Sequence, residues 1–176
     1  MRRKHTLVVY FSSSGHTALL ANRIATLCHA DIERIVERER RAGLRGHIRS
    51  AIESLLRLKP PIAYGRYHAA EYDLVILGTP VWFWNMASPV RTWLQRHRHE
   101  LANVALFCTY GRSGPARALD KLEQLSGRQA LARLALRQQA ARQSQDEPAL
   151  HRFLLELRRV RSVSLSVPPM HDQATA

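Results

Sequence analysis

The sequence predicts an α/β protein in which helices cover both faces of a five-stranded parallel sheet. Short apolar runs alternate along the chain with longer stretches of helical periodicity, as in β-α-β units. Two of these runs, 6–11 and 72–80, are apolar on both faces, which is typical of strands buried within a parallel sheet. A chain of 176 residues, 45% of them hydrophobic, is large enough to bury a core, and it shows no repeat or linker. We therefore expect a single domain.

Three of the five strands are expected in the first half of the chain. Residues 6–11 form the first, the alternating segment 30–36 predicts the second, and 72–80 predicts the third. A helix follows the first strand, and an amphipathic helix over 44–56 follows the charged surface connection 37–47. The apolar stripes of these two helices consist of Leu20, Ile24, Leu27 and Cys28, and of Leu44, Ile48, Ile52, Leu55 and Leu56.

The second half of the chain continues the same alternation. Ser88 is expected to cap a helix in which Pro89 is the first helical residue. Residues 104–108 predict a buried strand, and Pro115 begins the helix that follows the next polar turn.

Residues 130–136 are compatible with two structures. Their Ala, Leu and Arg residues favour a helix by propensity, whereas the alternation of apolar residues is also compatible with a strand. We expect a strand because the β-α alternation requires one there. A final helix starts near Asp146, so the domain is expected to span 1–161, and 162–176 are expected to form a loose tail.

Basic residues dominate the charge of the chain. Lys and Arg number 27 against 14 acidic residues, which gives a net charge of +13, and all but three of the 27 are arginine. Such a surface attracts acidic proteins, nucleotides or nucleic acid, or is simply solvated. Arginines concentrate between residues 34 and 57, but no aromatic residue is interleaved there, which disfavours nucleic-acid binding. They are Arg34, Arg38, Arg40, Arg41, Arg45, Arg49 and Arg57.

Neither a membrane span nor a metal site is expected. No stretch approaches the ~20 apolar residues of a span, and the first apolar run is too short for a signal peptide. We therefore expect a cytoplasmic protein. Cys28 and Cys108 are far apart without metal spacing, and the nine histidines are scattered.

Three loops are expected beyond the carboxyl ends of the strands, where ligands of such sheets bind. The first lies between a strand and a helix and consists of Ser12, Ser13, Ser14, Gly15, His16 and Thr17. Backbone N–H groups and the helix dipole favour an anion there, which predicts a phosphate site, although a Ser/Thr-rich cap that binds nothing explains the composition equally well. The second loop, 80–87, is rich in aromatic residues, and the third, 109–114, is polar and contains two glycines.

These loops carry three motifs that follow one another along the chain. They are Tyr10-x-Ser12-x-x-Gly15-x-Thr17, the segment from Asp73 to Trp82, and the segment from Ala105 to Gly114. With them the chain resembles the flavodoxin-like family from Thr6 to about Val160. The resemblance implies a sheet of order 2-1-3-4-5 and non-covalently bound FMN, whose phosphate would lie against residues 12–17. The flavin ring would lie between Pro80, Val81, Trp82, Phe83, Trp84 and Asn85 on one side and Thr109, Tyr110, Gly111, Arg112, Ser113 and Gly114 on the other.

Two residues and the charge depart from the pattern of this family. Trp84 and Arg112 stand where related sequences often have glycine, and electron-transfer flavodoxins are typically acidic. Trp82 matches the aromatic residue that packs on the flavin, and Asn85 is expected at the ring edge. An arginine at position 112 would stabilise negative charge on the reduced ring, or would point into solvent.

The resemblance implies an FMN-binding redox protein of flavodoxin type that transfers electrons to or from a partner protein. No catalytic side chain is required, because the flavin performs the chemistry. One alternative is a reductase that uses NAD(P)H and a small acceptor such as a quinone, although no nicotinamide motif is visible. A second alternative is a flavodoxin-fold binding protein without FMN.

Overall fold

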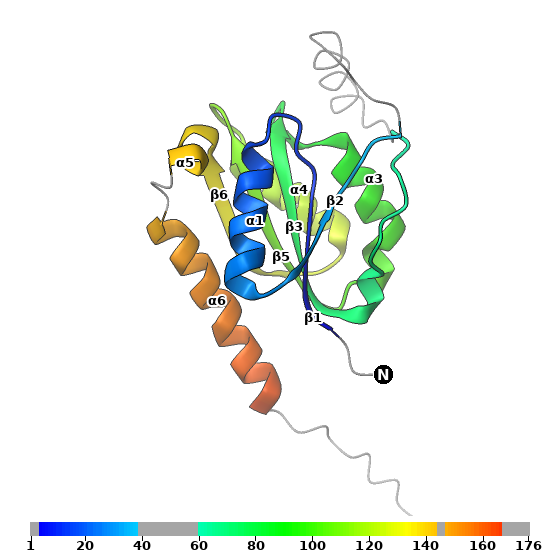
Figure 1. Ribbon diagram of the computed structural model, residues 1–176, viewed down its shortest axis with the longest axis vertical. Coiled ribbons are helices and arrows are strands. Elements are labelled where there is room, and N and C mark those ends of the chain that lie inside the picture. The colour runs from blue at the N-terminus through cyan, green and yellow to red at the C-terminus, as the bar shows by residue number, and fades with distance from the viewer. Residues whose placement is uncertain (1–3, 39–59, 144–146, 167–176) are drawn as a thin grey trace, which may run out of the picture.

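A sheet of five parallel strands and one short antiparallel strand forms the centre of the protein (Figure 1). The computed structural model describes residues 4–38, 60–143 and 147–166. The strands are β1 (Lys4–Tyr10), β2 (Asp31–Arg34), β3 (Tyr72–Trp82), β4 (Asn85–Met86), β5 (Val104–Tyr110) and β6 (Ala130–Arg137). The five parallel strands follow the order β2-β1-β3-β5-β6, which confirms the expected order 2-1-3-4-5, and β4 pairs antiparallel with the end of β3.

Helices form a layer on each face of this sheet (Figure 1). The helices α1 (His16–Cys28), α5 (Gln138–Gln143) and α6 (Glu147–Ser166) lie on one face. The opposite face carries α3 (Ser88–His97) and α4 (Pro115–Ser126). Two short 3₁₀ helices, η1 (Ala69–Glu71) and η2 (Arg98–Glu100), precede β3 and follow α3. The fold is therefore the doubly wound α/β arrangement that the alternation predicts.

The side chains of β1 alternate between two buried cores, one on each face of the sheet. Leu7 and Val9 belong to the core that contains Leu94 of α3, whereas Val8 belongs to the core that contains Ile24 of α1. Each of these side chains is at most 1% exposed. Burial on both faces explains why the strand reads as a continuous apolar run instead of an alternation.

Residues 130–136 lie in the strand β6, as the β-α alternation predicts. Leu134 pairs with Phe107 of β5, and the buried side chains Ala132, Leu134 and Leu136 share a core with Phe153 of α6. Tertiary pairing therefore outweighs the helix propensity of this segment. Helix-forming residues do form a helix immediately after β6, where the chain continues into α5. The sequence analysis did not predict this helix.

The second strand is shorter than the expected 30–36. Only residues 31–34 pair with β1, because β1 ends at Tyr10, and the N–H of Ile35 makes the last bond, to the carbonyl of Tyr10 at 2.7 Å. The expected cap of α3 is also displaced by one residue. Ala87 is the N-cap, and Ser88 is the first helical residue with a fully buried side chain.

The last helix extends beyond residue 161, where the domain was expected to end. Because α6 reaches Ser166, residues 162–166 are helical and do not belong to a loose tail. The helix expected over 44–56 and most of the connection 37–47 lie outside the described residues. Within the described part of the chain, no helix has the length and apolar character needed to cross a membrane.

Candidate functional site

Contacts join the three predicted loops at the carboxyl edge of the sheet. The hydroxyls of Thr17 in the first loop and Thr109 in the third are hydrogen-bonded at 2.8 Å, 92 residues apart in the chain. Phe11, directly before the first loop, packs edge-to-face on Trp82 of the second with ring centroids 5.6 Å apart. The predicted site residues therefore form one continuous edge.

Gly15 shapes the first loop as a turn that is open to an anion. Its φ of 90° lies in the left-handed region, which glycine adopts without a steric cost. A Cβ built on Gly15 meets nothing within 4 Å, so the space in front of this backbone is empty of protein. Helix α1 starts at the next residue with no acidic side chain in its first turn. The N–H groups of that turn have no partner within the helix, and they can bind a negatively charged group.

The side chains of the first loop divide into an inner and an outer group. The Ser12 hydroxyl is buried and accepts a bond from the N–H of Gly15 at 3.1 Å, and Thr17 is held by Thr109. Ser13 and Ser14 are exposed, and Ser14 Oγ contacts His16 Nδ1 at 2.9 Å. The inner hydroxyls therefore fix the turn, while the outer residues present donors to solvent.

The second loop is a tight β-hairpin, an arrangement that the sequence analysis did not anticipate. Trp82 of β3 pairs with Asn85 of β4, which leaves a turn of only two residues, Phe83 and Trp84. Their φ angles are 48° and 57°. Two positive φ angles are typical of a type I′ turn, which sequences usually mark with Asn-Gly or Gly-Gly. Two aromatic residues give no such signal.

The tip of the hairpin contacts the third loop at Gly114. A Cβ on this glycine would lie 2.5 Å from Cδ1 and 2.8 Å from Cα of Trp84, and the glycine itself has a φ of 87°. Gly114 is therefore required both by its backbone conformation and by the close approach of Trp84. Phe83 and Trp84 remain 57% and 52% exposed, so the hairpin also presents a large aromatic surface to solvent.

The remaining residues of the second loop point inward. Pro80 is buried, Val81 and Trp82 pack partly against the core, and the side chain of Asn85 is 5% exposed. The side-chain Oδ1 of Asn85 accepts a hydrogen bond from the N–H of Met86 at 3.0 Å. Asn85 therefore stabilises the hairpin from within, and its expected contact with a ring edge stays a prediction.

The third loop is shorter than the predicted segment 109–114. Thr109 and Tyr110 still belong to β5, and the turn consists of the exposed residues 111–113 followed by Gly114. Arg112 is exposed in this turn. A Cβ on Gly111 would also meet nothing within 4 Å, so both the first and the third loop leave open space at this edge.

Two residues that support the site were missed in the sequence. The guanidinium of Arg34, at the end of β2, donates to the carbonyl of Ser12 at 3.1 Å. The hydroxyl of Thr79 donates to the carbonyl of Pro80 and accepts the N–H of Ala87, both at 2.9 Å, so it closes the base of the hairpin. The only feature of the sequence that could have indicated either residue is its position toward the carboxyl end of a strand, where ligands of such sheets bind.

The described residues contain no group of three His, Cys, Asp or Glu side chains placed to hold a metal ion. The edge instead combines an open turn at a helix N-terminus, an aromatic hairpin and a polar turn that contains glycine. Such a set of groups suits a ligand with an anionic end and a flat ring.

Comparison with protein families identifies the family of the chain. The family model described as flavodoxin matches residues 5–144, which include all three loops. The chain therefore belongs to the flavodoxin family. The search of curated proteins found no match.

Solved structures of flavoproteins have a similar fold. A flavoprotein of Lactobacillus acidophilus in complex with FMN is 23% identical, with 80% of this chain and 97% of that chain covered and a TM-score of 0.66. A structure described as a flavoprotein of Bacteroides eggerthii is 21% identical, with 82% and 97% covered and a TM-score of 0.67. A third, from Bacteroides uniformis, is 21% identical, with 80% and 97% covered and a TM-score of 0.66. These likenesses concern the fold alone.

Proposed function

We propose that the protein is an FMN-binding redox protein that transfers electrons through the bound flavin. The observation that carries this proposal is the open turn at Gly15, at the N-terminus of α1, beside the aromatic hairpin. Membership of the flavodoxin family and the similarity to a flavoprotein that binds FMN support it. When bound, FMN supplies one- and two-electron chemistry, so no side chain has to act as acid, base or nucleophile.

The residues of the first loop are assigned to the phosphate. Backbone N–H groups of residues 13, 14, 16 and 17 and the hydroxyls of Ser13 and Ser14 donate hydrogen bonds to it. The buried hydroxyls of Ser12 and Thr17 keep the turn in this shape through their bonds to Gly15 and Thr109.

Residues of the second and third loops are assigned to the flavin ring. Aromatic side chains of the hairpin supply flat apolar surface, and offset stacking on a ring contributes about 0.5–1.5 kcal/mol beyond area burial. We assign Arg112, which is exposed in the turn after β5, to the stabilisation of negative charge on the reduced ring, an effect that would raise the reduction potential. The net charge of +13 favours an acidic partner protein or a nucleotide as electron donor. We assign the protein to the cytoplasm.

A comparison of FMN with riboflavin tests the phosphate site. Ser14→Asp places a carboxylate on the exposed rim of the first loop, where it repels a phosphate. We expect FMN to bind at least 10-fold more weakly to this variant, whereas riboflavin, which has no phosphate, binds unchanged. Gln129→Asp is the matched control, because residue 129 is exposed before the start of β6, at the opposite edge of the sheet.

The absorption spectrum after gel filtration tests whether the protein binds FMN. The purified protein is incubated with FMN, and a retained yellow chromophore is expected. Absence of bound flavin would contradict the proposal and favour the alternative of a binding protein without FMN. One observation favours this alternative. Trp84 of the second loop lies against Gly114 of the third loop, between the two loops that are assigned to the ring.

The reductase alternative is tested by rapid mixing of the FMN-loaded protein with NADPH in the absence of oxygen. A pure electron carrier shows no bleaching of the flavin on the timescale of seconds. Rapid bleaching by NADPH alone would instead assign the protein to the NAD(P)H-dependent reductases.

A further inference from the structure

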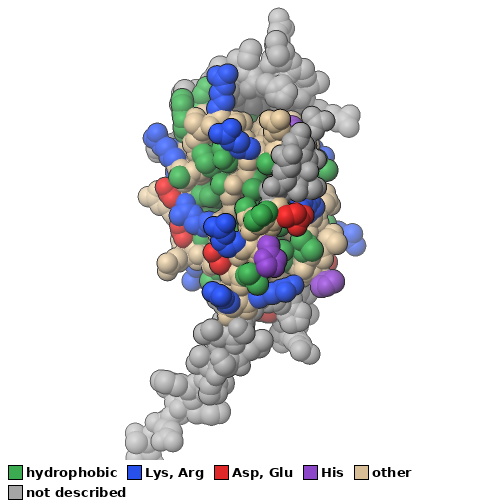
Figure 2. Space-filling view, turned by 90° about the vertical axis from the view of Figure 1, so that its left-hand side faces the viewer, with side chains coloured by type: hydrophobic (Ala, Val, Ile, Leu, Met, Phe, Trp, Pro, Cys, Tyr) green, Lys and Arg blue, Asp and Glu red, His purple; other side chains and the backbone are tan. Residues whose placement is uncertain are grey.

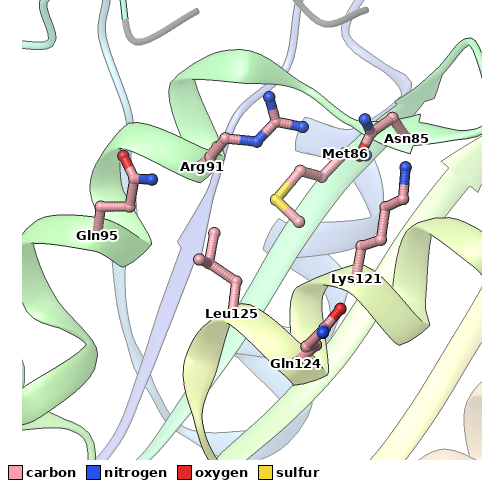
Figure 3. Close-up of a pocket in the computed structure, with 7 residues that line it drawn as sticks. All are labelled: Asn85, Met86, Arg91, Gln95, Lys121, Gln124 and Leu125. Atoms are coloured by element: carbon pink, nitrogen blue, oxygen red, sulfur yellow. The ribbon is translucent and has the colours of Figure 1, made fainter. Parts of the chain in front are cut away.

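The two faces of the sheet each carry a cavity between elements. One lies between α3 and α4, beside the hairpin residues Asn85 and Met86 (Figure 3). A smaller cavity of about 170 Å³ lies on the other face, where the first residues of β1 and β3 meet the end of α1 and the middle of α6. Because strands begin at this edge of the sheet, the smaller cavity is at the opposite edge from the three loops. It is therefore separate from the proposed flavin site.

Leucine side chains from three elements form the apolar wall of the smaller cavity. They are Leu27 of α1, Leu74 of β3, and Leu154 and Leu157 of α6. Such a wall suits a short apolar group, and the volume limits its size. An apolar cavity of about 150 Å³ binds benzene, which has about six heavy atoms. This cavity therefore has room for a group of about that size.

Cys28 lines the same cavity. It is partly exposed and forms no disulfide, and it packs against the core that contains Leu74 and Leu157. A small reagent can therefore reach Cys28 from solvent, whereas Cys108 is buried. Because Cys28 is the last residue of α1, the helix dipole does not favour its thiolate. Selectivity for a reagent then has to come from the group that enters the cavity.

Thr6 supplies a buried hydroxyl to this cavity. The residue is 3% exposed, and its Oγ1 has no hydrogen-bond partner among the described residues. Its side chain lies on the face of α1 and α6, because side chains alternate along β1 and Val8 belongs to the core of that face. A buried hydroxyl without a partner costs free energy, and a ligand that supplies one removes this cost. Thr6 is therefore a polar anchor that is independent of the thiol.

Arg158 of α6 supplies a cation to the cavity. Its guanidinium is exposed and takes no part in the ion pairs between described residues. Among the described residues that line the cavity there is no Asp or Glu. The guanidinium of Arg158 and the hydroxyl of Thr6 are both hydrogen-bond donors, and a carboxylate is a group that only accepts. A carboxylate therefore suits both of them.

From these contacts we propose that Cys28 is a mixed-disulfide site for small thiols that carry a carboxylate. The Cys28 thiol loses its proton to solvent, and the thiolate attacks one sulfur of a small disulfide. The S–S bond of the reagent breaks, a new S–S bond to Cys28 forms, and the other half of the reagent leaves as a thiolate. Cys28 is oxidised and the leaving sulfur is reduced, so the disulfide itself is the oxidant.

The half of the reagent that stays on Cys28 lies in the cavity. Its methylene groups pack against the leucine wall, and its carboxylate accepts hydrogen bonds from Arg158 and Thr6. A thiol with two methylene groups and a carboxylate adds about six heavy atoms to Cys28, the size that the volume allows.

Exchange equilibria with the disulfide of 3-mercaptopropionate test this proposal. Cystamine, which carries ammonium groups in place of the carboxylates, is the matched reagent. Each disulfide is mixed with its own thiol at fixed ionic strength, and peptide mass spectrometry gives the fraction of Cys28 that is modified. The same measurement in urea gives the reference for the unfolded chain. We expect folding to favour the carboxylate adduct about 5-fold, and not to favour the ammonium adduct.

Four variants locate the interaction. Arg158→Gln removes the cation and should lower the preference about 3-fold. Thr6→Val replaces the hydroxyl with a methyl group and should lower it by a similar factor. Arg152→Gln is the matched control, because it removes an exposed charge from the same helix outside the cavity, and it should leave the equilibrium unchanged. Cys28→Ser should abolish modification of the folded protein, since Cys108 is buried.

Three outcomes would overturn the proposal. The first is an equal effect of folding on the carboxylate and ammonium adducts. The second is an equal effect of Arg158→Gln and Arg152→Gln, which would reveal only the net charge of the protein. The third is modification of Cys108 to the same extent as Cys28 in the folded protein. None of these measurements requires bound FMN, so a failure of the proposed function leaves them intact.

Discussion

Trp84 has a positive φ of 57° in the hairpin turn, and its side chain packs against the backbone of Gly114. For an L-residue with a Cβ, the left-handed region costs about 1–2 kcal/mol. Contact with Gly114 offsets part of this cost. At this position backbone and side chain therefore favour different residues: glycine would suit the φ angle, and tryptophan provides the contact.

Two substitutions at position 84 separate these contributions. Trp84→Ala keeps the positive φ and loses the contact, so we expect it to lower the free energy of unfolding by about 1–2 kcal/mol. Trp84→Gly loses the same contact and also the strain, so its loss should be about 1 kcal/mol smaller. Urea denaturation measures both values. Equal stability of the two variants would show that the turn is unstrained.

Cys108, near the carboxyl edge of the sheet, illustrates how burial controls the reactivity of a thiol. The thiol lies at the end of β5 with no exposed surface, and desolvation raises its pKa to about 12, although the charge of Arg133 acts in the opposite direction. Since the thiolate is the reactive species, Cys108 is nearly inert at neutral pH.

We predict that iodoacetamide at pH 8 modifies Cys28, which is partly exposed, well before Cys108. Mass spectrometry of peptides after timed quenching gives the two rates. In the folded protein we expect Cys108 to react at least 100-fold more slowly than a free thiol, and in urea the two residues should react alike. Comparable rates in the native state would contradict the burial of Cys108.

At the level of elements, the hydrogen bond between Thr17 and Thr109 joins the start of α1 to the end of β5. Both side chains are at most 2% exposed. Loss of one hydroxyl leaves the other buried without a partner, which costs about 1–3 kcal/mol. The bond therefore stabilises the first and third loops together.

We predict that Thr109→Val lowers the free energy of unfolding by about 1–3 kcal/mol and weakens FMN binding. Addition of Thr17→Val should recover part of the stability, because both buried hydroxyls are then absent. Thermal denaturation of the two single variants and the double variant measures the coupling. Additive losses would show that the two hydroxyls do not interact.

The strands could be predicted from the sequence because burial on two faces leaves a continuous apolar pattern, whereas their order was implied by the resemblance to the flavodoxin-like family. The assignment of β6 depended on the β-α alternation, since the local propensity of residues 130–136 favours a helix. The hairpin could not be predicted, because Phe83 and Trp84 adopt positive φ angles without the usual glycine or asparagine. The position of Arg34 beside Ser12 depends on the pairing of β1 and β2, which local sequence does not encode.

For the whole molecule, two buried acidic groups predict a loss of stability at high pH. Burial, followed by the hydrogen bond to Asp31 at 2.6 Å, raises the pKa of Tyr72 well above its ordinary value of 10.0. The pKa of Cys108 is raised from 9.0 to about 12. A raised folded-state pKa gives stability that is fully present below the unfolded pKa and is lost as the pH rises toward the folded one.

We therefore expect the free energy of unfolding to fall from about pH 9 upward, by about 1.4 kcal/mol per pH unit for each group that titrates only when unfolded. Cys108 contributes from about pH 9 and Tyr72 from about pH 10. Urea denaturation at pH 8, 9.5 and 11 measures the decline. Cys108→Val should flatten the profile from pH 9, and Tyr72→Phe should flatten it above pH 10. An unchanged slope in both variants would contradict the assignment.

The net positive charge of the chain is visible on one face of the molecule. Lys and Arg side chains spread over the face shown in Figure 2, with apolar side chains between them. Arginines 40, 41, 45, 49 and 57, for which nucleic-acid binding was disfavoured, lie outside the described residues. Charge spread over such a face accelerates encounter with acidic partners in general.

The contact between Trp84 and Gly114 also has an evolutionary consequence. A large residue at position 84 is compatible only with glycine at position 114, because a Cβ there would overlap the indole. Glycine at position 84 would remove the indole from this contact. The Cα of residue 84 would still lie 2.8 Å from a Cβ at position 114, and the φ of 87° at Gly114 also favours glycine. In an alignment of the family, glycine at position 114 should therefore be kept whatever residue stands at position 84. The mutations that a lineage can accept thus depend on the distance between two loops.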